Sequence, residues 1–278
     1  MKPLLSWFAL ALAAAFASRP LRAVDIVAHR GASHDAPENT LAAERLAWQD
    51  GADVVETDIW LTKDGKIIVS HDKVPTRTTG SQLVIPEAMF DELRALDAGM
   101  WKGPQFAGEK LPTLDEQIAL IPPGKRMFVE IKCGPEIVPE LVRCLQRMHA
   151  SEKTITIISF NYDALQEVRR KLPRYQTQYL VGHPAANAQK AAKKNAPVKK
   201  QPTLDEIIQQ AKAAKLTGLD LQSTWPLTPA DVKRIKDAGL ELHVWTVDDP
   251  VVAQHWIELG AMSITTNRAG WLREQLKL

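Results

Sequence analysis

The sequence is short of cysteine and of net charge. Its 278 residues include two cysteines, Cys133 and Cys144, and 35 basic against 33 acidic side chains, which gives a formal net charge of +2. Two cysteines cannot form the disulfide framework of a small secreted domain, although a pairing of Cys133 with Cys144 stays open. The balanced charge argues against nucleic acid as a partner, because binding to backbone phosphates requires a clear excess of Lys and Arg.

Long apolar runs are also scarce, and the longest lies at the N-terminus. Residues 4–17 are rich in Ala and Leu, follow a Lys, and end in an Ala-x-Ala pattern, which is typical of a secretory signal. The run is too short for a comfortable membrane span, so an uncleaved anchor is the less favoured alternative. We expect residues 1–23 to be a signal peptide, cleaved after Ala17 or Ala23, and the mature protein to be periplasmic or secreted.

Beyond residue 23, short β-branched runs alternate with segments of helical periodicity. Strands are predicted at 24–29, 53–59, 66–70, 126–131, 154–159, 175–181, 217–221, 240–246 and 262–265. Helices are predicted at about 40–49, 113–120, 136–149, 161–171, 203–214, 229–238, 250–258 and 268–277. Capping signals mark several helix starts: Thr113 with Glu116, Asn161, Thr203 with Glu206, and Thr228 before Pro229.

Nine strands are one too many for a (β/α)8 barrel, and the third is the extra one. The six residues 60–65 that separate it from the second strand are too few for a parallel crossover but enough for a hairpin. We therefore predict an α/β protein in which residues 24–278 form a TIM (β/α)8 barrel with an extra antiparallel hairpin strand. Residues 72–112 form a small insertion after the second barrel strand, expected to cap the barrel mouth.

A second insertion, residues 183–202, contains five lysines and no acidic residue. Such a Lys-rich loop could attract anionic substrates or make contact with a membrane surface. A solvated, mobile loop without a ligand is the simpler explanation, and we favour it.

Carboxylates interrupt two of the predicted barrel strands. Glu56 and Asp58 are two residues apart in the second strand, so both point to one face. Two carboxylates on a buried face are costly unless a positive group lies between them. Glu130, in the next barrel strand, adds a third. Carboxylate oxygens suit hard cations, so we predict one divalent cation, Ca²⁺ or Mg²⁺, bound by this cluster, with salt bridges to Arg or Lys as the alternative.

Two histidines and two cations come from the same strand ends. His29 and Arg30 end the first strand, His71 follows the hairpin, and Lys132 shares the face of Glu130. An imidazole can transfer a proton near neutral pH, and a guanidinium can bind a phosphate through two hydrogen bonds. These side chains therefore predict an active site for an anionic substrate.

Two aromatic residues, Phe160 and Trp245, lie at the ends of later barrel strands. They are candidate walls of a substrate pocket, although packing in the core explains them as well. His243 alternates with Trp245 and could face the barrel interior, where we expect a structural role.

Together these residues resemble the glycerophosphodiester phosphodiesterase family, over nearly all of residues 24–272. The matching motifs are Ala28-His29-Arg30-Gly31, Pro37-Glu38-Asn39-Thr40, Val55-Glu56-Thr57-Asp58, Leu61-Thr62-Lys63-Asp64-Gly65 followed by His71-Asp72, Val129-Glu130-Ile131-Lys132, Val244-Trp245-Thr246-Val247 and Thr265-Thr266-Asn267-Arg268. One departure is Asn267, where many members have Asp; we expect it to change little, because it lies away from the proposed metal ligands.

The resemblance implies a TIM barrel that hydrolyses glycerophosphodiesters to an alcohol and sn-glycerol 3-phosphate with the help of a metal ion. It assigns the acid/base pair to His29 and His71, the metal to Glu56, Asp58 and Glu130, and the phosphate to Arg30 and, less firmly, Lys132. The nucleophile is water or the neighbouring hydroxyl of the glycerol, and we favour the hydroxyl.

Two other functions stay open. A lysophospholipase D would use the same site with a wider apolar entrance. A binding protein for glycerophosphodiesters would need no acid/base pair, so the presence of both histidines disfavours it.

Overall fold

The structure, a computed structural model, describes residues 24–184 and 202–278. The predicted signal peptide and most of the Lys-rich loop, residues 185–201, lie outside the described residues. Among the helices of the described ranges, none has both the length and the apolarity that a membrane span requires.

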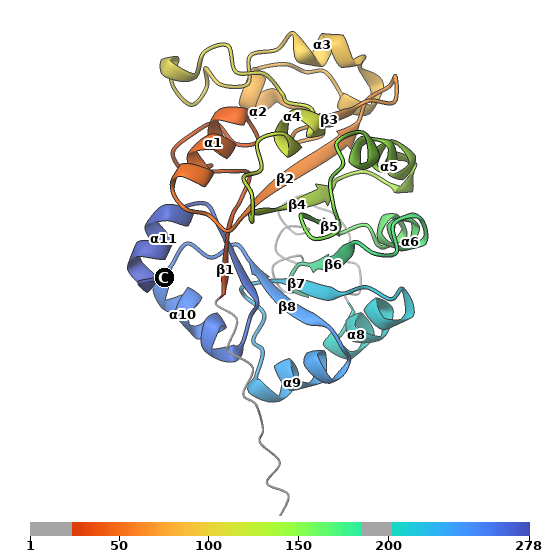
Figure 1. Ribbon diagram of the computed structural model, residues 1–278, viewed down its shortest axis with the longest axis vertical. Helices are drawn as coiled ribbons and strands as arrows, with labels where there is room; N and C mark the ends of the chain where they lie inside the picture. The colour runs from red at the N-terminus through yellow and green to blue at the C-terminus, as the bar shows by residue number, and fades with distance from the viewer. Residues whose placement is uncertain (1–23, 185–201) are drawn as a thin grey trace, which may run out of the picture.

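Eight parallel strands close into a barrel, as predicted (Figure 1). Around the ring the order is β1, β9, β8, β7, β6, β5, β4, β2, and the pairing of β1 with β2 closes it. The strands are β1 (Asp25–Ala28), β2 (Val54–Leu61), β4 (Arg126–Ile131), β5 (Ile155–Ser159), β6 (Gln176–Val181), β7 (Gly218–Gln222), β8 (Glu241–Trp245) and β9 (Ser263–Thr266). In this order β7 lies opposite β2 across the barrel.

The extra strand, β3 (Ile67–Val69), pairs antiparallel with the last residues of β2, which confirms the hairpin. β2 ends two residues later than predicted, because these last residues gain β3 as a partner. Thr62 closes the turn: its N–H donates to the carbonyl of Lys66, whose own N–H donates to the Thr62 hydroxyl. The hairpin thereby returns the chain to the barrel mouth just before His71.

Helices surround the barrel (Figure 1). They are α1 (Leu41–Gln49), α4 (Leu114–Ile118), α5 (Val138–Arg147), preceded by the 3₁₀ turn η3 (Pro135–Ile137), α6 (Tyr162–Lys171), α8 (Leu204–Ala213), α9 (Pro229–Asp237), α10 (Pro250–Leu259) and α11 (Ala269–Leu276). Thr113, Thr203 and Thr228 form capping boxes, and Asn161 accepts a hydrogen bond from the N–H of Ala164. The predicted start signals are therefore confirmed.

The insertion after β3 consists of short helical turns. They are α2 (Thr76–Thr79), η1 (Ile85–Glu87), α3 (Phe90–Arg94) and η2 (Pro104–Phe106). Ile85 and Leu93 are buried in a small apolar cluster with Ile68 of β3, and Trp60 of β2 packs against it. The insertion thus rests on the hairpin, in the upper part of Figure 1.

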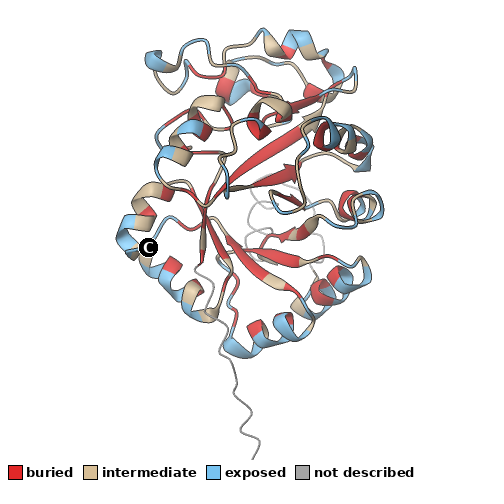
Figure 2. Cartoon of the chain, in the orientation of Figure 1, coloured by how far each residue is buried: buried red, intermediate tan, exposed pale blue. Residues whose placement is uncertain are grey.

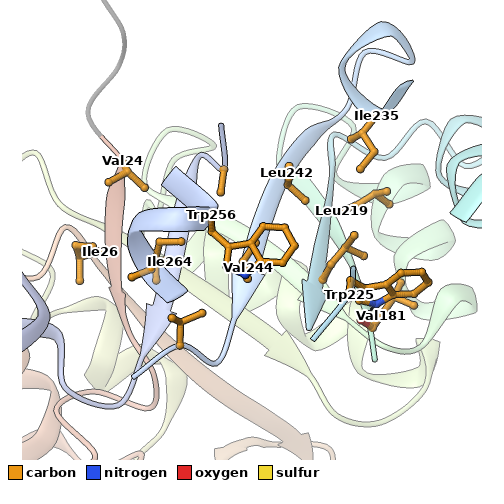
Figure 3. Close-up of a cluster of buried hydrophobic side chains, with 14 of the residues drawn as sticks. Val24, Ile26, Val181, Leu219, Trp225, Ile235, Leu242, Val244, Trp256 and Ile264 are labelled. Atoms are coloured by element: carbon orange, nitrogen blue, oxygen red, sulfur yellow. Dashed lines mark hydrogen bonds between the residues drawn. The ribbon is translucent and has the colours of Figure 1, made fainter. Parts of the chain in front are cut away.

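The barrel strands are mostly buried (Figure 2), and alternation along them separates an outer core from an inner one. Outward side chains such as Leu242, Val244 and Ile264 pack with Trp256 of α10 (Figure 3). Inside the barrel, the side chains Val27, Val54, Phe128, Ile158 and Leu180 form a separate buried cluster, against which Trp245 packs. The base of the barrel is therefore filled.

His243 faces the interior, as its alternation with Trp245 suggested. It is buried, and its ring nitrogens lie 2.9 Å from the Gln178 side-chain nitrogen and 2.8 Å from the Ser263 hydroxyl. These contacts fit the structural role expected for it. Cys133 and Cys144 are free thiols.

Candidate active site

A cavity of about 280 Å³ lies at the C-terminal ends of the barrel strands, where TIM barrels carry their active sites. Its walls are His29, Arg30, Glu56, His71, Glu130, Lys132, Ile158, Phe160, Leu180, Asp220, Trp245, Thr246 and Thr265. Of the residues predicted for the site, only Asp58 is missing from this wall. It lies within 3.4 Å of the Arg30 Nε and within 3.3 Å of the Lys132 Nζ.

Three buried carboxylates form the polar side of the cavity. Oxygens of Glu56, Asp58 and Glu130 lie within 4.8 Å of one another, a spacing that one ion could bridge. Glu56 Oε1 is buried without a hydrogen-bond partner, and Asp58 Oδ1 has only the ion pair with Lys132 Nζ at 3.3 Å. Buried polar atoms normally have partners, so Glu56 Oε1 in particular fits the role of a cation ligand. The donor set, all carboxylate, suits Ca²⁺ or Mg²⁺.

The charges of the cluster are only partly balanced by protein cations. Burial and the neighbouring Asp58 raise the pKa of Glu130 to about 8, and the same two causes raise the pKa of Glu56. Burial would also raise the pKa of Asp58, but Lys132 and Arg30 hold it below its usual range. Lys132 also pairs with Glu130 at 2.7 Å. No Arg or Lys in the described ranges forms an ion pair with Glu56, so salt bridges alone do not account for the cluster.

His29 is held through its Nδ1, 2.8 Å from Oδ1 of Asn267. The Asn267 amide nitrogen donates to Asp248, so its oxygen faces the ring and His29 Nδ1 carries the proton. His29 Nε2 then faces the cavity, 4.0 Å from Glu56 Oε2. Burial, and next the charge of Arg30, lower the pKa of His29 to about 4, so the ring is neutral at pH 7. Asn267 lies outside the carboxylate cluster, as expected, but it contacts the ring of His29, which the sequence did not indicate.

His71 is held in the same way but by a carboxylate. Its Nδ1 lies 2.8 Å from Oδ1 of Asp72. The His71 side chain is 32% exposed, against 18% for His29, so it lies nearer the mouth of the cavity. Burial lowers the pKa of His71 and Asp58 opposes this. Each histidine thus presents one ring nitrogen to the cavity.

Arg30 is fixed by an unusual backbone. Its φ of 58° is in the left-handed region, which is unfavourable for a residue with a side chain. In that conformation its N–H donates to Glu56 Oε2 at 3.0 Å. Gly31 follows with a φ of 78°, and a Cβ there would lie 2.6 Å from a backbone atom of Ala43. The turn after β1 therefore requires this glycine.

Arg77, from α2 of the insertion, connects the two sides of the site. It donates two hydrogen bonds of 2.7 Å to Glu38, which in turn accepts from Arg30 at 2.9 Å. Its Nε also donates to the second oxygen of Asp72, the partner of His71. One insertion residue therefore contacts the carboxylates that hold both Arg30 and His71.

Phe160 and Trp245 form the aromatic wall. Their rings meet edge to face with centroids 5.4 Å apart, and Phe160 is 46% exposed at the mouth. The Trp245 indole N–H donates to the backbone carbonyl of Asp220. Both predicted wall residues therefore line the cavity, and Trp245 also packs against the inner core.

Sequence reasoning missed several residues of the site. Glu38 and Asn39 were noticed only as part of a motif, yet Asn39 donates to Asp58 at 2.7 Å. Arg77 gave no signal, because nothing in its neighbourhood indicates which distant carboxylates it reaches. Asp220 could have been found: it interrupts an apolar strand, which is the pattern that revealed Glu56.

Comparison with known proteins places the chain among phosphodiesterases. A family model described as the glycerophosphoryl diester phosphodiesterase family matches residues 29–270. A glycerophosphodiester phosphodiesterase of Caldanaerobacter subterraneus is 32% identical over 249 residues, covering 87% of this chain and 93% of the relative. One from Bacillus subtilis is 30% identical, covering 87% and 82%.

Solved structures agree. A phosphodiesterase of Oleispira antarctica, solved with the product sn-glycerol-3-phosphate, has a TM-score of 0.78 and 28% identity, covering 91% of this chain and 97% of that chain. A Thermotoga maritima glycerophosphodiester phosphodiesterase has a TM-score of 0.70 at 22% identity, covering 90% and 97%, which supports the fold.

Proposed function

Because the chain belongs to the glycerophosphoryl diester phosphodiesterase family, we propose that it hydrolyses glycerophosphodiesters to an alcohol and sn-glycerol 3-phosphate with one divalent cation and two histidines. The Oleispira antarctica phosphodiesterase was solved with the product sn-glycerol-3-phosphate, which supports the product proposed for this chain. The observation that carries the proposal is one cavity that gathers two histidines, the side chains of Arg30 and Lys132, and a cluster of carboxylates in which Glu56 Oε1 has no partner.

The cation, Ca²⁺ or Mg²⁺, is assigned to Glu56, Asp58 and Glu130. When bound, it would neutralise phosphate charge and favour ionisation of a nearby hydroxyl. Arg30 and Lys132 supply fixed positive charge beside the cluster. Oriented charges of this kind favour the transition state, in which the phosphate oxygens gain negative charge.

The surroundings of the two histidines suggest different roles. His29 contacts a neutral amide oxygen and is the deeper ring, beside Glu56, so we assign it as the general base. His71 contacts the carboxylate of Asp72, which favours the protonated ring, and lies nearer the mouth. We assign it as the general acid, which donates its proton to the departing alcohol.

The nucleophile is assigned to the glycerol hydroxyl next to the phosphate ester. Its oxygen forms a bond to phosphorus as the bond to the departing alcohol breaks, and His29 takes the hydroxyl proton. Water then opens the resulting cyclic phosphate to give sn-glycerol 3-phosphate. A diester that lacks this hydroxyl should not be cleaved, and its cleavage at an undiminished rate would indicate direct attack by water.

The first test is release of sn-glycerol 3-phosphate from glycerophosphocholine. Purified protein is stripped with a chelator and assayed before and after addition of Ca²⁺ or Mg²⁺. Release should depend on the added ion, because the three carboxylates lie close enough to share one ion and Glu56 Oε1 is buried without a partner. Undiminished release after complete stripping would refute the metal requirement.

The exposed aromatic rim favours lysophospholipase D as a second candidate, because Phe160 offers an apolar surface at the mouth. Cleavage of lysophosphatidylcholine without cleavage of glycerophosphocholine would support it. Binding of glycerophosphocholine without turnover of either would support a binding protein.

Replacing Arg77 tests how the insertion contributes. Arg77→Ala should lower kcat by roughly 10- to 100-fold, because freeing Glu38 and Asp72 allows Arg30 and His71 to shift from productive positions. The matched control is Arg94→Ala, an arginine of the same insertion that pairs with Glu116. Equal kcat values for the two variants at equal stability would contradict the bracing role.

A further inference from the structure

Asp220 is a carboxylic acid of the cavity wall for which neither the fold nor the proposed mechanism has a use. Its side chain is 1% exposed, at the centre of β7, and borders the cavity. Oδ1 is buried without a partner, and no side-chain hydrogen bond or ion pair of Asp220 occurs in the described part of the chain. A buried carboxyl without a partner is costly, so a contact from outside the protein is the natural explanation.

The neighbouring polar side chains bond mainly to each other, although Gln178 Oε1 is also buried without a hydrogen-bond partner. Gln178, His243 and Ser263 form a hydrogen-bonded chain inside the barrel. Trp245 donates to the backbone carbonyl of Asp220, not to its carboxyl. Nothing in this network needs an acidic side chain on β7.

The position of Asp220 separates it from the metal cluster. β7 lies opposite β2, which carries Glu56 and Asp58, and Asp220 is not among the carboxylates close enough to share an ion. Between the two sides, the wall on β5 and β6 is apolar, with Ile158 and Leu180, whereas the wall on the β8 and β9 side has Trp245, Thr246 and Thr265. Along the β5 and β6 side, the cavity wall is therefore charged at one end, apolar in the middle, and ends in the single carboxyl of Asp220.

A glycerol phosphate has the same order of chemical groups. Its phosphate is anionic, its carbons are apolar at their C–H edges, and it ends in a hydroxyl. The enclosed end of the cavity suits the part that all glycerophosphodiesters share, whereas the variable alcohol would extend past Phe160 to solvent. Resting on the proposed function, we infer that the Asp220 carboxyl binds the terminal hydroxyl of the substrate's glycerol and selects for glycerol diesters.

The raised pKa of Asp220, caused by burial and by the charge of Glu130, is consistent with this contact. A neutral carboxyl can both donate to and accept from a hydroxyl.

The test compares two substrates with the wild-type enzyme and two variants. The substrates are glycerophosphocholine and its analogue in which the terminal CH₂OH is CH₃, which keeps the phosphate and the adjacent hydroxyl. Wild-type kcat/KM should be lower for the analogue by about 100-fold or more, because the analogue leaves a buried polar group unpaired. D220A should lose about 10- to 100-fold on glycerophosphocholine and little on the analogue. D220N, which keeps the shape and the hydrogen bonding, should retain most of the preference.

Three results would overturn the inference. One is equal cleavage of both substrates by the wild-type enzyme, a result that can be obtained without any variant. Another is an equal loss on both substrates in D220A, since that indicates a general effect on the site. The third is a D220A loss on glycerophosphocholine but not on glycerophosphoglycerol, which would indicate recognition of the cationic head group. Thermal unfolding checks that the variants fold. A wild-type enzyme that releases no sn-glycerol 3-phosphate from glycerophosphocholine would refute the proposed function itself.

Discussion

His71→Ala and His29→Ala are each expected to abolish measurable turnover of glycerophosphocholine while metal binding persists. Each histidine presents one ring nitrogen to the cavity, and general acid or base catalysis typically contributes ~10²–10⁴-fold. Neither ring is a ligand in the carboxylate cluster, so the affinity for Ca²⁺ or Mg²⁺, measured by calorimetry, should change little. The measurement is kcat together with metal affinity for each variant.

The matched control is His34→Ala. His34 is an exposed histidine outside the cavity wall, and its ring forms a hydrogen bond with Asp35. It should keep wild-type activity. Full activity in either His29→Ala or His71→Ala would refute the assignment of the pair.

The two histidines should also differ from each other with activated substrates. A diester whose alcohol is a good leaving group, such as a nitrophenol, needs no general acid. His71→Ala should therefore recover much of its activity with the nitrophenyl diester, whereas His29→Ala should not. The opposite pattern would exchange the two roles.

The sequence was sufficient where the chemistry conflicts with the local fold. Glu56 and Asp58 stand out because a carboxylate pair on one face of a buried strand has no structural reason, and the period of the strand places both on that face. The hairpin could be predicted because six residues cannot cross a barrel. In both cases the residues that carry the evidence lie close together in the sequence.

The residues that were missed act over long range. Arg77 reaches Glu38 across 39 positions, and Asn267 reaches His29 across 238. Such pairs depend on how the insertion and the last barrel loop settle in three dimensions, which no local pattern records. Asp220 differs from these residues. Its position in an apolar strand is visible in the sequence, whereas its lack of a hydrogen-bond partner is visible only in the structure.

Glu56→Gln should abolish activity and yet make the metal-free protein more stable. In the metal-free protein, Glu56 is buried beside Asp58 and Glu130, with one oxygen unpartnered. Removing its charge relieves repulsion, while Gln keeps an oxygen that can accept from the Arg30 N–H. The metal-free variant should therefore be more stable than the metal-free wild type, by about 1–3 kcal/mol.

Added metal should reverse this order. At 100 times its Kd, an ion that binds only the folded wild type adds about 2.7 kcal/mol of stability, whereas the variant, lacking one charged ligand, should gain almost nothing and be inactive. Thermal unfolding with and without Ca²⁺ or Mg²⁺ measures both effects.

Glu44→Gln is the matched control: Glu44 is also buried, and burial raises its pKa to about 8, but it lies in α1, outside the cluster. The metal-free Glu44→Gln variant can be more stable than wild type as well, yet the stability that it gains from added metal should equal the gain of wild type. An equal gain in Glu56→Gln would remove Glu56 from the metal site, because a carboxylate that binds the ion cannot lose its charge without weakening the ion's effect on stability.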